Sequence, residues 1–248
     1  MLGHAVWSVL AERYDVSAST RKTLDVGDNE AIAAIQKIES RFDWVINAIG
    51  ITIPFSKQNP RNTYFVNGVF PHILCSIFGK RLIHITTDCV YSGTEGFPYN
   101  EESEKSPQDI YGLSKSMGES KNCITLRTSI IGRELGGFTG LLEWFLYQKG
   151  KTVKGFTEHY WNGITTRQFG KICGQIIEAN DVPPGIYHVF STTLSKYQML
   201  CAFKEKYKVN CTIVPDGQSK LNRTLTTVKY LNRWLEIPSF EKMLEELP

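Results

Sequence analysis

The chain has 248 residues, of which 42% are hydrophobic and 21% are charged, a composition typical of a globular protein with one large domain or two small ones. Lysine and arginine number 28 against 25 aspartate and glutamate residues. So small an excess argues against a dedicated nucleic-acid-binding protein and gives no reason to expect binding to an anionic membrane surface. No apolar stretch is long enough to span a bilayer.

The N-terminal segment and the cysteines bear on where the protein works. Residues 1–16 lack a basic region and a small-residue cleavage site, so this segment is interpreted as the start of a helix rather than as a signal peptide. The six cysteines include no C-x-x-C pair, and most lie among apolar residues. We therefore expect buried free thiols, no metal site and a cytoplasmic protein.

The first half of the chain alternates apolar runs of strand length with helix candidates. Strands are predicted over residues 14–19, 42–50, 80–88 and 123–132. Helices are predicted over residues 28–40, with Asp28 as the cap, and over 64–78 and 111–120. Apolar strands that are separated by helices indicate a parallel α/β sheet.

The second half of the chain has a looser, mixed pattern. Helices are predicted over residues 141–149, 165–180, 195–207 and 239–247, and strands over 152–156, 185–190 and 211–215. No linker precedes this half. We predict a first domain over residues 1–130 and a smaller, mixed region over 131–248, some elements of which pack back on the first domain.

Three polar segments stand where apolar strands end or helices begin: residues 86–88, 111–115 and 127–129. In open α/β sheets, ligands bind at the carboxyl ends of the strands. Tyr111 and Lys115 are four residues apart, so they share one face of the predicted helix. A nearby ammonium favours the phenolate, and a tyrosine tuned in this way can exchange a proton with a carbonyl or hydroxyl oxygen. The Thr87 hydroxyl could hold that same oxygen in place.

The Tyr-x-x-x-Lys spacing alone is a weak signal, because a solvated tyrosine–lysine pair on a helix has the same pattern. The spacing recurs at Tyr147 and Lys151, where Gly150 interrupts it and no strand-ending hydroxyl precedes it. We interpret that second pair as a solvated helix end. Tyr111 lies 24 residues after Thr87 within a strand–loop–helix unit, and this context favours a catalytic role.

The ordered motifs resemble those of the extended short-chain dehydrogenase/reductases, and most closely those of the dTDP-4-dehydrorhamnose reductases. The segments that carry this resemblance are TTDCVYSG (86–93), YGLSKSMGE (111–119) and LRTSIIG (126–132), with INAIG, FVN, WNGITT and LNRTL in support. The resemblance implies a Rossmann-like sheet with a smaller substrate region. It also implies a reductase that delivers hydride from a nicotinamide cofactor to a keto group of a nucleotide-linked deoxysugar.

Residue roles follow from the resemblance. Tyr111 is implied as the catalytic acid, with Lys115 as its partner and Thr87 as the third member of the triad. The residues implied in cofactor binding are Gly3, Ser19, Arg21, Asp25, Val26, Asn47, Ala48 and Gly50, together with Tyr111 and Lys115. The residues implied in substrate binding are Asp88, Trp161 and Arg223; Trp161 could equally be a core residue.

The cofactor implied is NADPH, with NADH as the alternative. NAD-preferring sites usually place an acidic residue on the ribose 2′-hydroxyl, whereas residues 17–22 offer a serine and an arginine that could receive a 2′-phosphate. Arg21 could also be a solvated loop charge. The partner expected is the nucleotide-sugar substrate, and the sequence is compatible with a homodimer.

One departure excludes a related activity, and two alternatives stay open. The 4,6-dehydratases that resemble this sequence need an Asp-Glu pair after the threonine, whereas Cys89 follows Asp88 here. Cysteine cannot assist water elimination as glutamate does, so a dehydratase is not expected. The alternatives are a sugar-nucleotide epimerase with the same triad and a non-catalytic regulatory or binding protein of the same fold.

The other departure concerns the cofactor loop. The family opens with a strand and a G-x-x-G-x-x-G loop, of which Gly3 matches only the last glycine. The first strand is central in the strand order 3-2-1-4-5-6. We therefore expect the chain as given to bind a dinucleotide weakly or not at all, and we expect the natural protein to begin upstream of Met1.

Overall fold

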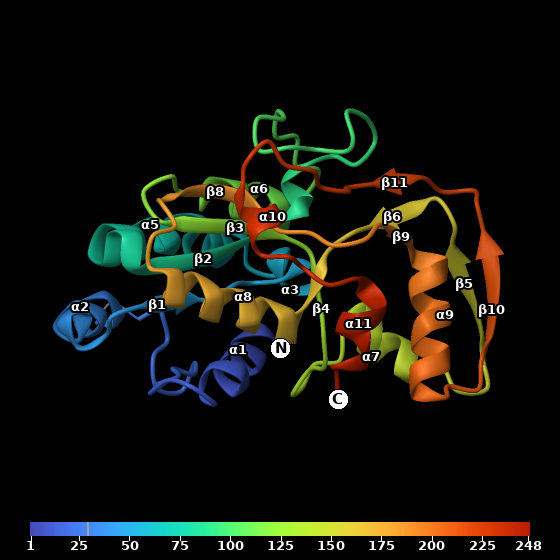
Figure 1. Ribbon diagram of the computed structural model, residues 1–248, viewed down its shortest axis with the longest axis horizontal. Helices are drawn as coiled ribbons and strands as arrows, with labels where there is room; N and C mark the ends of the chain where they lie inside the picture. Colours follow the sequence, from blue (N-terminus) through green and yellow to red (C-terminus); the bar gives the residue numbers. More distant parts are fainter. Residues whose placement is uncertain (29) are drawn as a thin grey trace.

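The computed structural model describes residues 1–28 and 30–248 (Figure 1). Its main sheet has four parallel strands in the order β1 (Val45–Asn47), β2 (Leu82–Thr87), β3 (Ile124–Thr128) and β8 (Gly185–His188). Every residue of β2 and β3 is buried, as expected for central strands that are covered on both faces. The predicted parallel α/β sheet is confirmed.

Helices cover both faces of this sheet. On one face, α1 (Leu2–Leu10) lies beside α8 (Thr166–Ala179), as Figure 1 shows below the sheet. On the opposite face, α5 (Phe70–Phe78) packs against β2. Both α1 and α5 place apolar residues four positions apart, which makes one buried stripe on each helix. These residues are Leu2, Val6 and Leu10 on α1, and Phe70, Leu74 and Phe78 on α5.

Short helices connect the strands of the first half. They are α2 (Ala31–Lys37), η1 (Glu39–Arg41), α3 (Ile53–Ser56), α4 (Pro60–Tyr64), η2 (Phe65–Val69) and η3 (Gly79–Arg81). The predicted helix over 64–78 is present, but it begins earlier, where the Asn59 side chain accepts the backbone N–H of Asn62. Glu30 is the cap of α2, so the prediction of Asp28 as that cap is wrong.

Two predicted strands differ from the structure at the edge of the sheet. Residues 14–19 form no strand, and the strand predicted over 42–50 is reduced to the three residues of β1. A strand is held by hydrogen bonds to a neighbouring strand. In the described part of the chain, β1 pairs only with β2, and no strand lies on its other side. These segments are apolar, but they have no neighbouring strand on that side with which to form hydrogen bonds.

The second half builds a lobe of small sheets around α9 (Lys196–Tyr207), on the right of Figure 1. Its paired strands are β5 (Thr152–Phe156) with β10 (Thr212–Asp216), β6 (His159–Trp161) with β9 (Leu194–Ser195) and β11 (Leu221–Asn222), and β4 (Ile130–Ile131) with β7 (Ile164–Thr165). Its remaining helices are α7 (Leu141–Leu146) and α11 (Phe240–Glu245), while α10 (Leu231–Trp234) contacts β8. A separate apolar core fills this lobe.

The expectation of free thiols is confirmed, because all six cysteines are free and four of them are buried. None of the helices described is long and apolar enough to cross a membrane. Within the described residues, no group of three histidine, cysteine, aspartate or glutamate side chains is arranged to hold a metal ion.

Candidate active site

The end of β2 carries the first part of the site. Thr87 is the last residue of the strand and lies opposite Thr128 of β3. Its hydroxyl donates to Asp88 Oδ1 (3.1 Å) and accepts the Cys89 backbone N–H (3.2 Å), which starts the short helix η4 (Asp88–Val90). The strand therefore ends in a turn that fixes the orientation of the Thr87 hydroxyl.

Helix α6 (Ile110–Met117) carries the second part. The Asp109 side chain caps it by accepting the Gly112 backbone N–H (2.7 Å). Gly112 lies so close to Cys89 that a methyl group in its place would overlap the Cys89 carbonyl oxygen. This close approach needs glycine, and it brings Tyr111 next to the residues that follow β2.

Lys115 lies one turn along α6 and is only 4% exposed. Its ammonium donates to the Ile85 carbonyl oxygen of β2 (2.7 Å). Burial lowers the pKa of Lys115 to about 8, and the Glu119 carboxylate acts in the opposite direction. A Cβ atom at Gly50 would lie 4.0 Å from Lys115 Nζ, so the ammonium faces the loop that follows β1.

Tyr111 is a protonated phenol at neutral pH. Burial raises its pKa, and Cys89 adds to this shift, whereas a hydrogen bond with Thr87 lowers the pKa. Thr87, Tyr111 and Lys115 thus converge at the carboxyl end of β2, but the Lys115 charge is not among the influences on the Tyr111 pKa, which is raised. The expectation that a nearby ammonium favours the phenolate is therefore not met. The protonated Tyr111 phenol can donate a proton to a substrate oxygen that Thr87 also contacts.

The loop after β1 is tied to α6 by a residue outside the predicted site. The Asn67 side chain accepts the Ile51 backbone N–H (2.8 Å), donates to the Ile51 carbonyl oxygen (2.9 Å) and donates to Ser114 Oγ (3.0 Å). Asn67 is fully buried in the helical run that precedes α5. The motif FVN contained this residue, but the sequence could not show that its amide bridges two distant segments.

Asn47 points into the protein. Its amide donates to His84 Nδ1 (3.1 Å), and its carbonyl oxygen accepts the Ile49 backbone N–H (3.1 Å). Burial, followed by the charge of Lys115, lowers the pKa of His84 well below its usual range, so the imidazole is neutral. Asn47 therefore shapes the loop after β1, while Gly50 in that loop faces the site.

A cavity of about 220 Å³ lies beside that loop. It is lined by Ser19, Thr20, Arg21, Leu24, Asp25, Val26, Ile49, Gly50, Ile51, Asn62 and Val66. Five of the predicted cofactor residues meet there, because Ser19, Arg21, Asp25, Val26 and Gly50 all line this one cavity. The sequence reasoning missed Leu24, Ile51 and Asn62, which lie outside the motifs, and Val66, which lies in the FVN motif but was given no role.

Arg21 has a partner within this cavity. Its Nε donates to Asp25 Oδ2 (2.9 Å), and the Arg21 side chain is otherwise exposed. This hydrogen bond, followed by that of the Gly27 backbone N–H, lowers the pKa of Asp25. Gly3 and Ala48 lie apart from this cavity: a Cβ atom at Gly3, on α1, would lie 3.6 Å from the Ala48 Cβ.

The C-terminal half contributes cations to the site. Arg223 donates through Nε to the Tyr91 carbonyl oxygen (2.9 Å) and through Nη1 to Cys89 Sγ (3.5 Å), which places it beside Asp88. Burial raises the pKa of Asp88, while Arg223 and then Lys196 lower it. Lys196 was missed by the sequence reasoning, because nothing in its local pattern distinguishes it from a solvated helix lysine.

Trp161 is a core residue that also faces this cluster. It is 4% exposed and packs edge-on against Phe240, with ring centroids 5.7 Å apart. The Lys196 ammonium lies 5.8 Å from the centroid of the Trp161 ring. The interpretation of Trp161 as a core residue is confirmed, and its role in substrate binding stays a prediction.

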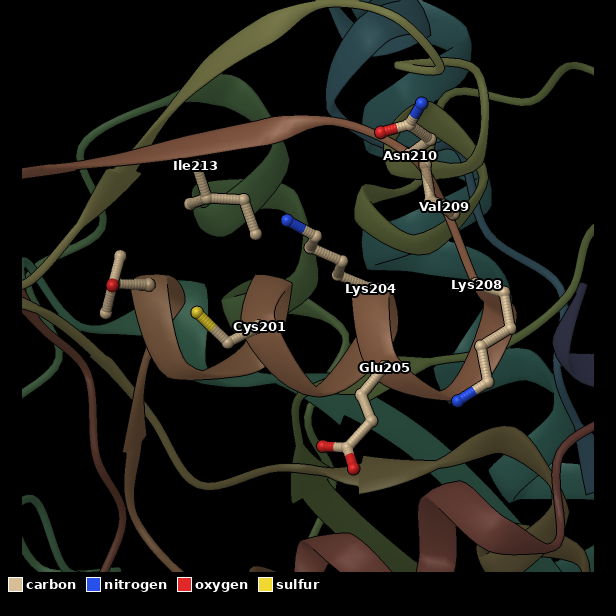
Figure 2. Close-up of a pocket in the computed structure, with 8 residues that line it drawn as sticks. Cys201, Lys204, Glu205, Lys208, Val209, Asn210 and Ile213 are labelled. Carbon is tan, nitrogen blue, oxygen red and sulfur yellow. The ribbon is translucent and has the colours of Figure 1, made fainter.

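A larger hollow, of about 510 Å³, lies between α9 and β10 on the outer side of the second lobe (Figure 2). Figure 2 shows Cys201 and Lys204 on α9, with Ile213 on the strand beside it. None of the residues predicted for the site lines this hollow. Its position is unrelated to the convergence at the end of β2.

One family model matches most of the chain. Residues 1–228 match the model of the RmlD substrate binding domain. The chain is 24% identical over 231 residues to the spore coat polysaccharide biosynthesis protein SpsK of Bacillus subtilis, which covers 89% of this chain and 77% of that protein. It is 31% identical over 145 residues to the dTDP-4-dehydrorhamnose reductase of Mycobacterium tuberculosis, covering 55% of this chain and 47% of that protein. The match thus spans less than half the length of the mycobacterial relative.

A solved structure has the same fold. The dTDP-4-dehydrorhamnose reductase of Bacillus anthracis, crystallised in complex with NADP, superposes with a TM-score of 0.82 at 19% identity. The superposition covers 99% of this chain and 94% of that chain. The predicted Rossmann-like α/β fold is confirmed.

Proposed function

The chain belongs to the family of the RmlD substrate binding domain, and from this premise we propose that it is an NADPH-dependent reductase of a nucleotide-linked 4-keto-deoxysugar. The observation that carries the proposal is the convergence of Thr87, Tyr111 and Lys115 at the carboxyl end of β2. The relatives named as reductases of dTDP-4-dehydrorhamnose support this substrate class.

In the proposed reaction, the protein positions the keto group and supplies a proton. Tyr111, kept protonated by burial, donates its phenolic proton to the oxygen of the substrate carbonyl. Thr87 holds that oxygen in place, because its hydroxyl is already oriented by Asp88 and Cys89. Lys115, anchored on Ile85, lies one turn from Tyr111 on α6, and we propose that its charge turns toward the phenolate that proton transfer leaves on Tyr111. NADPH, when bound, supplies the hydride.

The described residues fit parts of this cofactor. The cavity around Ser19, Arg21, Val26 and Gly50 is a place for the adenosine end, with the Arg21 guanidinium available to a 2′-phosphate. Lys115 is available to the ribose next to the nicotinamide. For the pyrophosphate, the chain offers the start of α1 with Gly3. We propose that residues 1–130 largely hold the cofactor and residues 131–248 largely hold the substrate.

An assay of both cofactor and product tests the proposal. With dTDP-4-dehydrorhamnose and NADPH, we expect one NADPH to be oxidised for each sugar reduced. Isomerised sugar with no net loss of NADPH would instead identify an epimerase, and binding of the nucleotide sugar with no turnover at saturating NADPH would favour a non-catalytic binding protein. We also propose a cytoplasmic location, because all six cysteines are free thiols.

Replacing Arg21 is expected to weaken the preference for NADPH. The Arg21→Ala variant loses the charge that would meet the 2′-phosphate, so kcat/KM for NADPH should fall about tenfold while kcat/KM for NADH stays within about twofold. Lys22→Ala is the matched control, since Lys22 is an exposed neighbour outside the cavity. An NADH preference that Arg21→Ala leaves unchanged would remove Arg21 from the cofactor site.

A further inference from the structure

Lys196 occupies a built position at the start of α9. Ser195 caps this helix with a reciprocal pair of hydrogen bonds to Gln198, so the first turn is fixed. β9 pairs with β6 just before the helix, with Leu194 opposite Trp161. This pairing places the Lys196 ammonium over the Trp161 ring, 5.8 Å from its centroid.

The Lys196 ammonium lacks a carboxylate partner. Among the described residues, the ion pairs within 4.0 Å include neither Lys196 nor Arg223. Burial lowers the pKa of Lys196, and the largest opposing influence is that of Asp88. The same Asp88 faces Arg223, and its Oδ1 already accepts hydrogen bonds from Thr87 and Cys89. Two cations thus surround one carboxylate, which leaves positive charge in excess.

This excess positive charge lies close to the residues of the proposed reaction. On one side, Lys196 acts on Asp88, which directly follows Thr87. On the other side, its charge lowers the pKa of His159 at the start of β6, after the effect of burial. The ammonium therefore lies between the residues of the proposed reaction and the strands of the second lobe. In a nucleotide sugar, the diphosphate lies between the reacting sugar ring and the nucleoside.

We infer that Lys196, together with Arg223, binds the diphosphate of the nucleotide-sugar substrate and that Lys196 sets the specificity for a diphosphate over a monophosphate. This inference rests on the proposed function. Phosphate oxygens would supply the anionic partners that neither cation has among the described side chains. The Trp161 ring beneath the ammonium would fix its direction.

A purely structural role of Lys196 would give different binding results from a role in diphosphate binding. A lysine that only packs on Trp161 would change stability when replaced, but it would not discriminate between nucleotides that differ by one phosphate. The Lys196→Met variant keeps the packing length and removes the charge, and Lys196→Arg restores the charge. Lys204→Met is the matched control, because Lys204 is exposed on the same helix, eight residues further on.

Calorimetric titration of the full chain with dTDP and dTMP, repeated with UDP and UMP, tests the inference. The wild-type protein should bind the diphosphate more tightly than the monophosphate. Lys196→Met should weaken diphosphate binding about 10- to 100-fold and leave monophosphate binding within about twofold. Lys196→Arg should recover most of the loss, and Lys204→Met should match the wild type.

Three results would overturn the inference, and they differ in whether the proposed reductase still stands. If the wild-type protein prefers the diphosphate and Lys196→Met keeps that preference, the role of Lys196 is wrong while the proposed reductase stands. If the wild-type protein binds none of these nucleotides, both the Lys196 role and the proposed function fail. Equal weakening of diphosphate and monophosphate binding would indicate a structural role and would also overturn the inference.

Discussion

Tyr111→Phe should lower the rate of keto-sugar reduction about 10²- to 10⁴-fold while binding of the sugar nucleotide changes little. The substitution removes the phenolic oxygen and proton and keeps the ring, so the packing of α6 against the residues after β2 is retained. Single-turnover reduction with saturating NADPH measures the chemical step. Titration with the product nucleotide sugar measures binding.

The second Tyr-x-x-x-Lys pair in the chain supplies the control for this variant. Tyr147 lies just after α7 and is 60% exposed, and no strand that ends in a hydroxyl residue directly precedes it in the sequence pattern. Tyr147→Phe should therefore leave the rate at the wild-type value. Full turnover by Tyr111→Phe would disprove its assignment as the proton donor, and an equal loss in both variants would point to a non-specific effect on folding.

Glu119→Gln should lower the free energy of unfolding by about 3–5 kcal/mol. The Glu119 carboxylate accepts two parallel hydrogen bonds from Arg127, at 2.8 and 2.7 Å, and the two side chains are 1% and 2% exposed. Arg127 Nη1 also contacts Tyr91 Oη and His188 Nε2. Removal of the carboxylate charge leaves the buried Arg127 guanidinium without its ion-pair partner. Breaking a buried ion pair by removing one partner is strongly destabilising.

An exposed ion pair provides the matched control for this second variant. Lys171 Nζ lies 2.7 Å from Glu246 Oε1, and both side chains are more than a third exposed. Glu246→Gln should cost about 1 kcal/mol or less, because water screens such pairs. Urea titration of both variants gives the comparison. If the two variants lose the same small amount, the buried pair does not stabilise the fold in the way proposed.

Glu119 also links stability to the proposed chemistry. It follows α6, two residues beyond the end of the helix that carries Tyr111 and Lys115, and its charge raises the pKa of Lys115 against the effect of burial. Glu119→Gln should therefore lower the pKa of Lys115 further below about 8. The Arg127 pair thus fixes one end of the helix while the close approach at Gly112 fixes the other.

The parts of the site that could be predicted from sequence are those set by local spacing. Tyr111 and Lys115 share a helix face because four residues make about one turn, and Thr87 ends a strand because an apolar run of strand length stops there. The buried strands β2 and β3 could likewise be predicted from their continuous apolar runs. These features depend on neighbours within a few positions, so the order of residues determines them directly.

The remaining features depended on residues that are distant in the chain. Residues 14–19 have a strand-like composition but form no strand, because a strand requires a partner and the ladder beside β1 has none in the described chain. The Asn47 amide turns inward because His84, on the neighbouring strand, offers a ring nitrogen. Composition and spacing carry no information about such partners.

The same reason explains why Lys196 escaped sequence reasoning. Its charge acts on Asp88 only because β9 pairs with β6, which brings the start of α9 near the turn after β2, where the segment around Arg223 also returns. The sequence by itself determined the helix and strand that carry Thr87, Tyr111 and Lys115. Only the tertiary structure decided which charges surround them, because Coulomb interactions and desolvation depend on distance in space and not on separation along the chain.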